Sequence, residues 1–173
     1  ALITLAAIKR AGCGKEFARE NEAIFKLWTD YLVKHGYMPE NQLCTDDFSG
    51  HINNNCNLSL KAILGIASFS YIYGDESYME IAKKMAKDWV VDSSNGVASM
   101  LSFDIKDSWS LKYNIIWDKI FGFGLFPEEV YEKEIKLYSN NMNRYGVPLG
   151  NSYAYSKLDW MFWTTVMTDN KEY

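Results

Sequence analysis

The hydrophobic pattern divides this chain into two kinds of helix. Some segments are apolar on nearly every side, as in helices buried within a domain, and others carry an apolar stripe opposite charged residues. The apolar helices are predicted at about residues 2–11, 55–73, 111–121 and 157–168. The amphipathic helices are predicted at about residues 16–35, 76–91 and 127–140, with a short strand at 97–103. The stripe of the first amphipathic helix comprises Phe17, Ile24, Leu27, Trp28, Tyr31 and Leu32.

The two kinds of helix alternate with a period of roughly fifty residues. Stacked helical hairpins explain such an alternation, because each hairpin buries its apolar helix against its neighbours and leaves the amphipathic helix outside. The sequence therefore predicts one all-α domain over residues 1–173, built from three hairpins and one further helix. We interpret it as about half of an α/α toroid and as a fragment of a larger domain. An open solenoid is the alternative architecture.

A half ring is expected to expose apolar surface where further hairpins would pack, and such surface favours association. We expect two partners for the domain: the upstream portion of the same polypeptide, and a second copy of this chain that rebuilds the ring as a homodimer.

Composition and charge narrow the function classes. The net charge is −4 and the basic clusters are short and lie among acids, which argues against a nucleic-acid partner. No apolar run reaches membrane-spanning length, and the apolar start of the chain lacks the basic leader of a signal peptide. We therefore expect no nucleic acid, no membrane and no targeting segment in this chain.

Three cysteines, Cys13, Cys44 and Cys56, occur without the C-x-x-C spacing of zinc or redox sites. Cys44 and Cys56 flank a polar stretch and could lie close together, but small buried thiols are the favoured interpretation over a disulfide.

Polar and aromatic residues gather directly before each apolar helix after the first. Because the apolar helices of a hairpin array run in the same direction, these clusters are expected to meet at one end of the domain, where helix N-termini suit a carboxylate or an oxyanion. This convergence predicts a site for a polar small molecule. The clusters comprise Asp46, Asp47, His51, Asn54 and Asn55; Asp104, Asp107, Trp109, Tyr113, Trp117 and Asp118; and Asn151, Tyr153, Tyr155, Lys157, Asp159 and Trp160.

Four of these residues are predicted to be catalytic. Asp46 and Asp47 lie close to His51, and neighbouring carboxylates and imidazole shift each other's pKa and permit acid–base work. Asp159 is predicted as a second carboxylate. The alternative for each aspartate is a helix cap or a first-turn acid. A metal at His51 is disfavoured because no second histidine is near, so no metal or other cofactor is predicted.

The predicted binding residues combine amide groups, which can pair with an amide or a hydroxyl, and aromatic rings, which can form stacking walls. Packing alone is the alternative for the tryptophans, and a core ion pair is the alternative for Asp118. The predicted binding residues are Asn54, Asn55, Trp109, Tyr113, Trp117, Asp118, Tyr153, Lys157 and Trp160.

Four segments carry a resemblance to a known family: LWTDYLVKHG, NQLCTDDFSGHINNNCNLSLKAILGI, SWSLKYNIIWDKIFGFGLFP and RYGVPLGNSYAYSKLDWMFWT. In this order, they resemble the glutaminase A-like family of fungi and bacteria. The resemblance implies the C-terminal part of a six-hairpin toroid, hydrolysis of L-glutamine to glutamate and ammonia, and a secreted, periplasmic or cell-envelope location. It supplies no catalytic assignment, so the residue roles are inferred from the clusters alone.

The resulting hypothesis is water attack on the side-chain amide, assisted by a carboxylate, because no serine or cysteine stands beside a base as a nucleophile would. If an essential carboxylate lies upstream, this chain alone is inactive. A glycoside hydrolase or carbohydrate-binding module on the same architecture is the first alternative. A non-catalytic helical scaffold is the second.

Overall fold

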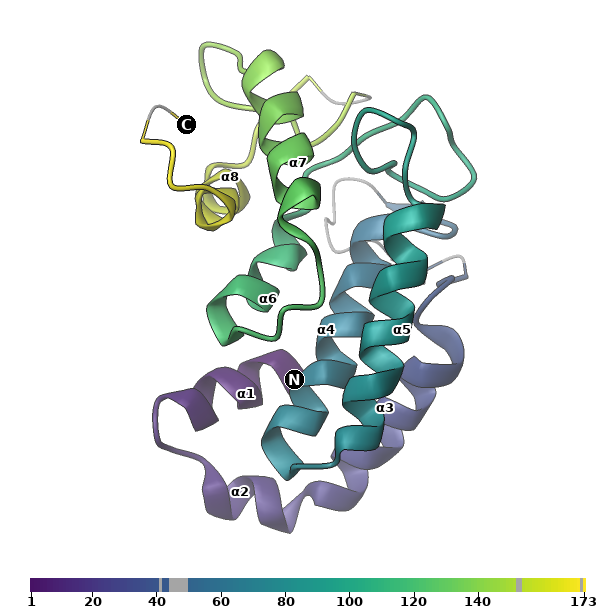
Figure 1. Ribbon diagram of the computed structural model, residues 1–173, viewed down its shortest axis with the longest axis vertical. Coiled ribbons are helices and arrows are strands. Elements are labelled where there is room, and N and C mark those ends of the chain that lie inside the picture. The colour runs from purple at the N-terminus through teal and green to yellow at the C-terminus, as the bar shows by residue number, and fades with distance from the viewer. Residues whose placement is uncertain (41, 44–49, 152–153, 172) are drawn as a thin grey trace.

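The computed structural model describes residues 1–40, 42–43, 50–151, 154–171 and 173 (Figure 1). Its α-helices are α1 (Leu2–Arg10), α2 (Lys15–Glu20), α3 (Glu22–His35), α4 (Cys56–Tyr73), α5 (Glu76–Asp92), α6 (Ile116–Phe121), α7 (Glu128–Asn140) and α8 (Leu158–Thr164). A 3₁₀ turn, η2 (Tyr113–Ile115), directly precedes α6, and a second, η3 (Thr165–Met167), directly follows α8. Strands β1 (Gln42–Leu43) and β2 (His51–Ile52) pair antiparallel, with Leu43 opposite His51. The all-α prediction is confirmed.

Helix α4 is the centre of the domain. It packs against α5, α1, α3 and η2. Most of its residues are buried, including Leu60, Ile63 and Ile66, which are fully inaccessible. Gly74 ends it in the left-handed conformation, at φ 76°, which favours glycine. An apolar helix thus forms the inside of the array, as its sequence indicates.

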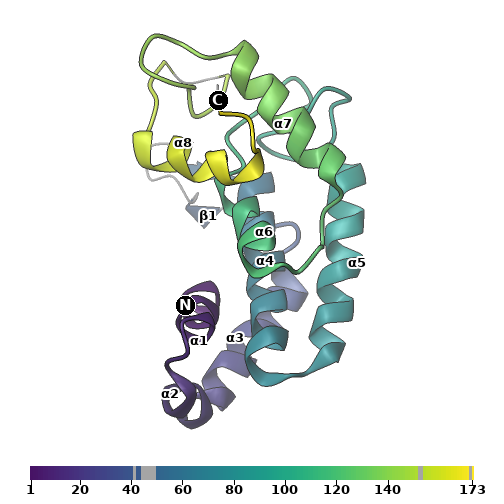
Figure 2. The same ribbon diagram turned by 60° about the vertical axis from the view of Figure 1, so that its left-hand side comes forward.

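Helix α5 is the outer partner of α4. Asp75 caps its start by accepting a hydrogen bond from the backbone N–H of Ser77, at 3.1 Å. Its Tyr78, Met85 and Trp89 pack inward. Two views agree that α1, α2 and α3 lie toward one end of the molecule, and that α7 and α8 lie toward the other (Figures 1 and 2).

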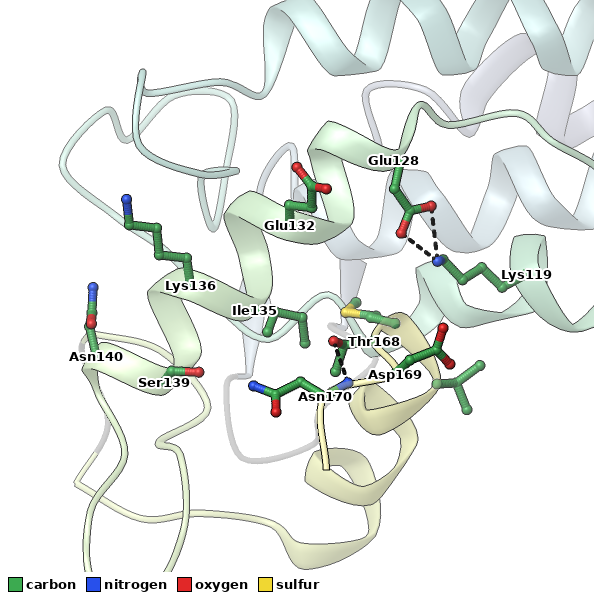
Figure 3. A pocket seen from close by; sticks show the side chains of 12 residues that line it. Lys119, Glu128, Glu132, Ile135, Lys136, Ser139, Asn140, Thr168, Asp169 and Asn170 are labelled. Atoms are coloured by element: carbon green, nitrogen blue, oxygen red, sulfur yellow. Dashed lines mark hydrogen bonds and ion pairs between the residues drawn. The ribbon is translucent and has the colours of Figure 1, made fainter. Parts of the chain in front are cut away.

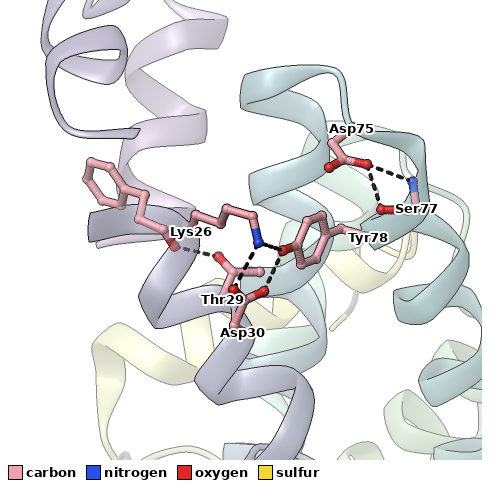
Figure 4. Close-up of polar contacts among 7 residues, drawn as sticks. Lys26, Thr29, Asp30, Asp75, Ser77 and Tyr78 are labelled. Carbon is pink, nitrogen blue, oxygen red and sulfur yellow. Dashed lines mark hydrogen bonds and ion pairs between the residues drawn. The ribbon is translucent and has the colours of Figure 1, made fainter. Parts of the chain in front are cut away.

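Helices α3 and α5 are also joined by a polar cluster (Figure 4). The Lys26 ammonium donates to Asp30 at 2.9 Å and to the Tyr78 hydroxyl at 2.8 Å, and that hydroxyl donates to the other Asp30 oxygen. Because the ion pair is half exposed, its main effect is to orient the two helices rather than to stabilise the fold strongly.

Three predicted elements differ from the structure. The helix predicted at 16–35 breaks at Asn21, whose side-chain amide donates to the Phe17 carbonyl at 2.8 Å and so competes with the helical backbone. The strand predicted at 97–103 is absent from this described segment, because the Asn95 side chain binds the N–H groups of Val97 and Ala98 in a turn. The helix predicted from 111 begins at η2, since the Leu111 N–H pairs with the carbonyl of Leu149.

Candidate functional site

The polar loops before α4 and before η2 meet directly. Asn54 adopts a left-handed backbone, φ 53°, which asparagine tolerates better than most residues. Its side-chain amide donates to the Asp104 carboxylate at 2.9 Å, and its carbonyl accepts the N–H of Phe103 at 3.0 Å. The Ser102 hydroxyl donates to the Asn53 carbonyl at 2.8 Å. The loop before α4 is therefore hydrogen-bonded to the loop before η2, which belongs to the next hairpin.

The loop before η2 meets the loop before α8 in the same way. The Asn151 side chain accepts the N–H of Trp109 at 3.1 Å and donates to the carbonyl of Asp107 at 2.9 Å. Beside it, Ser110 and Gly150 form an isolated β-bridge. Described residues of all three polar clusters thus lie in three loops that are joined by hydrogen bonds. We call residues 50–55, 102–110, 149–151 and 154–160 the polar rim.

Trp160 of the rim belongs to a group of packed aromatic side chains that extends beyond the rim. The Tyr113 and Trp160 rings stack with centroids 4.4 Å apart, and the Lys157 ammonium lies 4.3 Å from the centre of the Trp160 ring. Trp117 packs edge-on against Trp163. The Trp160 ring is therefore engaged within the protein, and this limits its use as a stacking wall for a ligand.

A buried polar network, which the hydrophobic pattern does not indicate, is joined to the rim at Ser110. The ammonium of Lys112 is fully buried and donates to the Ser99 carbonyl and to the carbonyl and hydroxyl of Ser110, at 2.8 to 3.2 Å. Burial lowers the pKa of Lys112, and the nearby Glu134 carboxylate opposes that shift. The signal in the sequence was one lysine between apolar residues, in Leu111-Lys-Tyr113.

Glu134 completes this network from α7. One carboxylate oxygen accepts the N–H of Ser99 at 2.7 Å, and the other accepts the hydroxyl of Tyr138 at 2.7 Å. The Tyr138 oxygen in turn accepts the N–H of Lys112 at 2.8 Å. The network therefore fixes the loop around residue 99 and the start of η2 to an outer helix.

Two predicted binding residues have side chains that contact the fold itself. The side-chain oxygen of Asn55 caps α4 by accepting the N–H of Leu58 at 2.8 Å. Asp118 is buried, and its carboxylate accepts the N–H groups of Leu125 and Phe126 and the hydroxyl of Tyr131, at 2.8 to 3.3 Å. Asp118 therefore holds the turn between α6 and α7. It forms no core ion pair with its neighbour Lys119, which pairs with Glu128 instead.

Backbone N–H groups in the first turn of α4 also bond to other groups of the protein. The N–H of Cys56 donates to the Leu101 carbonyl at 3.0 Å, and the N–H of Leu58 is taken by the cap. These two N–H groups therefore already have partners within the protein.

The predicted catalytic residues are placed in part. His51 is exposed on β2, and Asp159 is exposed in the first turn of α8. Asp46, Asp47 and Tyr153 lie outside the described residues, as does Cys44. Trp109 is half-buried at the rim. The predicted roles of these residues stay predictions.

The Cys56 thiol is buried at the first position of α4, and burial raises its pKa to about 12. A thiol with so high a pKa holds very little of the thiolate needed for nucleophilic attack at neutral pH. Cys56 is therefore a packing residue. Cys13 is exposed, in the turn that follows α1.

A polar groove of about 570 Å³ lies away from the rim, between α7 and the segment that follows α8 (Figure 3). Lys119 and Glu128 pair at one end at 2.7 Å, and Glu132 and Lys136 lie along α7. Charges of both signs line it, so no single class of charged ligand is favoured there.

Neither a metal site nor a membrane span emerges from the described part of the chain. Its His, Cys, Asp and Glu side chains form no group of three that could hold a metal ion. None of its helices is both long and apolar enough to cross a membrane.

Comparison with known proteins identifies the family. The model of the glutaminase A six helical-hairpin domain matches residues 1–173. Glutaminase A of Aspergillus oryzae is 32% identical over 163 residues, covering 88% of this chain and 24% of that protein. A probable glutaminase of Arthroderma benhamiae is 28% identical over 190 residues, covering 89% of this chain and 22% of that protein. No solved structure matches significantly.

This chain spans about a quarter of the length of these relatives. The family match nevertheless extends over every hairpin described above, from α1 to α8. The chain belongs to the glutaminase A six helical-hairpin family.

Proposed function

We propose that this chain supplies part of the active site of an amidohydrolase that converts L-glutamine to glutamate and ammonia. The observation that carries the proposal is the polar rim, in which loops of successive hairpins are hydrogen-bonded into one surface at the end of the array. The glutaminase names of the two relatives supply the reaction and the substrate.

In the proposed reaction, a carboxylate removes a proton from water while the water oxygen bonds to the side-chain amide carbon of glutamine. The carbon–nitrogen bond then breaks, and an acid protonates the departing nitrogen so that ammonia leaves. We assign the first role to Asp159 together with Asp46 or Asp47, and the second to His51. The exposure of Asp159 and His51 supports these roles, because a substrate must reach both groups. A secreted or cell-envelope location is part of the same proposal.

Water attack is favoured over a covalent thioester. Cys56 is the described cysteine nearest the rim, and its burial and raised pKa oppose a nucleophilic role. Binding of the substrate amide is assigned to the Asn54 side chain, which lies beside the Asp104 carboxylate. A sugar substrate is less well supported, because Trp160 is covered by Tyr113 and Lys157 rather than open for stacking.

The experiment is an assay of ammonia release from L-glutamine by the complete polypeptide that contains this chain. Asp159→Asn and Asp47→Asn are each expected to lower kcat by about 10²- to 10⁴-fold, the usual contribution of a general base. Glu80→Gln is the matched control, because this carboxylate is 69% exposed on the outer helix α5. Unchanged turnover in both aspartate variants would refute the assignment. Retention of a glycan with no glutamine turnover would favour the sugar alternative.

A further inference from the structure

Asn54 has an unusual backbone conformation for a residue with a side chain. Among the described residues it is the one other than glycine with a positive φ, 53°, and such conformations cluster at ligand-binding positions. Its N–H donates to the Pro39 carbonyl at 2.7 Å, and its carbonyl accepts the Phe103 N–H at 3.0 Å. Both backbone groups are therefore satisfied without the side chain. Whereas the Asn55 side chain caps α4, the Asn54 amide is available for a contact beyond the local backbone.

Asp104 fixes the direction in which the Asn54 amide faces. A carboxylate accepts hydrogen bonds and cannot donate them, so the amide atom 2.9 Å from its Oδ2 is the nitrogen and not the oxygen. One of the two Nδ2 hydrogens is used in this contact, and the second hydrogen and Oδ1 remain. Within the described part of the chain, neither that Oδ1 nor the other Asp104 oxygen has a hydrogen-bond partner.

The backbone that carries this pair is held from two sides. The Asp104 N–H donates to the Ser102 hydroxyl at 3.3 Å, and that hydroxyl donates to the Asn53 carbonyl at 2.8 Å. The ring of Phe103 stacks on the ring of Tyr37, with centroids 5.6 Å apart. A polar pair that is oriented before a ligand arrives loses little conformational freedom on binding. The pair therefore offers one donor and two acceptors in a fixed arrangement.

This arrangement matches a primary carboxamide better than a carboxylate. The carboxamide of glutamine has both a donor and an acceptor, so it can donate to the Asn54 Oδ1 and accept the second Nδ2 hydrogen. The carboxylate of glutamate has acceptors alone, so it has nothing to donate to that Oδ1. It also brings a second negative charge next to Asp104, and like charges repel.

We propose that Asn54 and Asp104 set the preference of the site for a primary carboxamide over the carboxylate that its hydrolysis produces. Asn54 binds the carboxamide. Asp104 is a positioning residue that holds the orientation of this amide, and its charge opposes binding of the product. Glutamate therefore leaves the site readily and inhibits weakly. This inference rests on the proposed function, because it takes glutamine to be the ligand of the rim.

The experiment measures ammonia release by the complete polypeptide at varied L-glutamine, with and without added L-glutamate, which gives KM for the substrate and Ki for the product. Asp104→Asn removes the charge and keeps the size of the side chain. Asn54→Gly removes the amide and keeps a residue that adopts a positive φ readily. Glu80→Gln is the matched control for the loss of one negative charge, because this carboxylate is 69% exposed on α5.

We expect Asp104→Asn to lower the Ki for glutamate at least about fivefold, the effect of one unit charge about 4 Å away in water, and to change the KM for glutamine less. Added salt should lower this Ki more in the unmodified polypeptide than in Asp104→Asn, because salt screens an exposed charge. Asn54→Gly should raise the KM for glutamine about tenfold, through two lost hydrogen bonds. Glu80→Gln should leave both constants unchanged.

The outcomes separate this inference from the reaction on which it rests. Glutamine turnover with a Ki for glutamate that Asp104→Asn leaves unchanged would overturn the inference alone. A rise of KM and Ki together at a constant ratio would also overturn it, because Asp104 would then serve only the structure of the loop. An unchanged KM in Asn54→Gly would overturn the role of Asn54. No ammonia release by the unmodified polypeptide would overturn the proposed function and this inference with it.

Discussion

Lys112→Met removes a buried ammonium and keeps the apolar stem of the side chain. The change leaves the Ser99 carbonyl and both oxygen groups of Ser110 without their donor, in a region that excludes water. At about 1 kcal/mol for each lost hydrogen bond, the cost is about 3 kcal/mol. The Glu134 carboxylate also loses its nearby cation, which brings the total toward the range of about 3–5 kcal/mol measured for broken buried ion pairs.

Urea denaturation followed by circular dichroism measures this cost in the 173-residue chain. A loss of about 3 kcal/mol corresponds to a fall in Tm of roughly 6–12 °C for a domain of this size. The informative control is the double variant Lys112→Met with Glu134→Gln, which neutralises both groups. It should be more stable than Lys112→Met alone, because the remaining carboxylate no longer lies uncompensated. A cost below about 1 kcal/mol for the single variant, or a double variant less stable still, would refute the reasoning.

Three further variants test separate contacts. Asp118→Asn should lower the free energy of unfolding by about 1.5–3 kcal/mol in urea titrations, since it weakens hydrogen bonds to a charged acceptor; an unchanged value would contradict its role in the turn after α6. Asn55→Ala should cost about 1 kcal/mol through the lost α4 cap, and Asn55→Ser should restore most of it; equal stabilities of the two variants would exclude capping as the cause. Burial raises the pKa of Tyr131, so above pH 10 the unfolded state loses the phenol proton while the folded state keeps it, and stability should fall with rising pH. Tyr131→Phe should flatten that fall in melts between pH 9 and 11, and an identical slope would show that Tyr131 is not responsible.

The hydrophobic pattern was sufficient to predict the fold class and the main helices. Helices α4, α5 and α7 lie within a residue or two of their predicted bounds, because long runs with one clear periodicity leave little choice of structure. The break at Asn21 was missed and the strand predicted at 97–103 was wrong, since each depends on an asparagine side chain that competes with the backbone for hydrogen bonds. Such competition is decided by local geometry rather than by periodicity.

The meeting of the polar loops was predictable from the sequence, whereas the partner of each polar side chain was not. The polar clusters before successive apolar helices do meet, because the hairpins stack in one direction and bring those loops to the same end. Which polar side chains face a ligand could not be predicted. Asn55 and Asp118 have the chemistry of binding residues, yet the backbone N–H groups of α4 and of the turn after α6 are their partners. A sequence shows a side chain's hydrogen-bonding capacity but not which partner uses it.

The contacts that hold the polar rim together join residues far apart in the chain. Asn151 and the Asp107 carbonyl are 44 positions apart, and Asn54 and Asp104 are 50 apart. Closing such long loops costs entropy that only docked hairpins can offset, so these bonds belong to the late stages of folding. Hairpins can form locally in any order, but the rim exists only once they have stacked in register. Slow protection of the Trp109 and Phe103 amides in pulse-labelling exchange would therefore report when the candidate site is assembled.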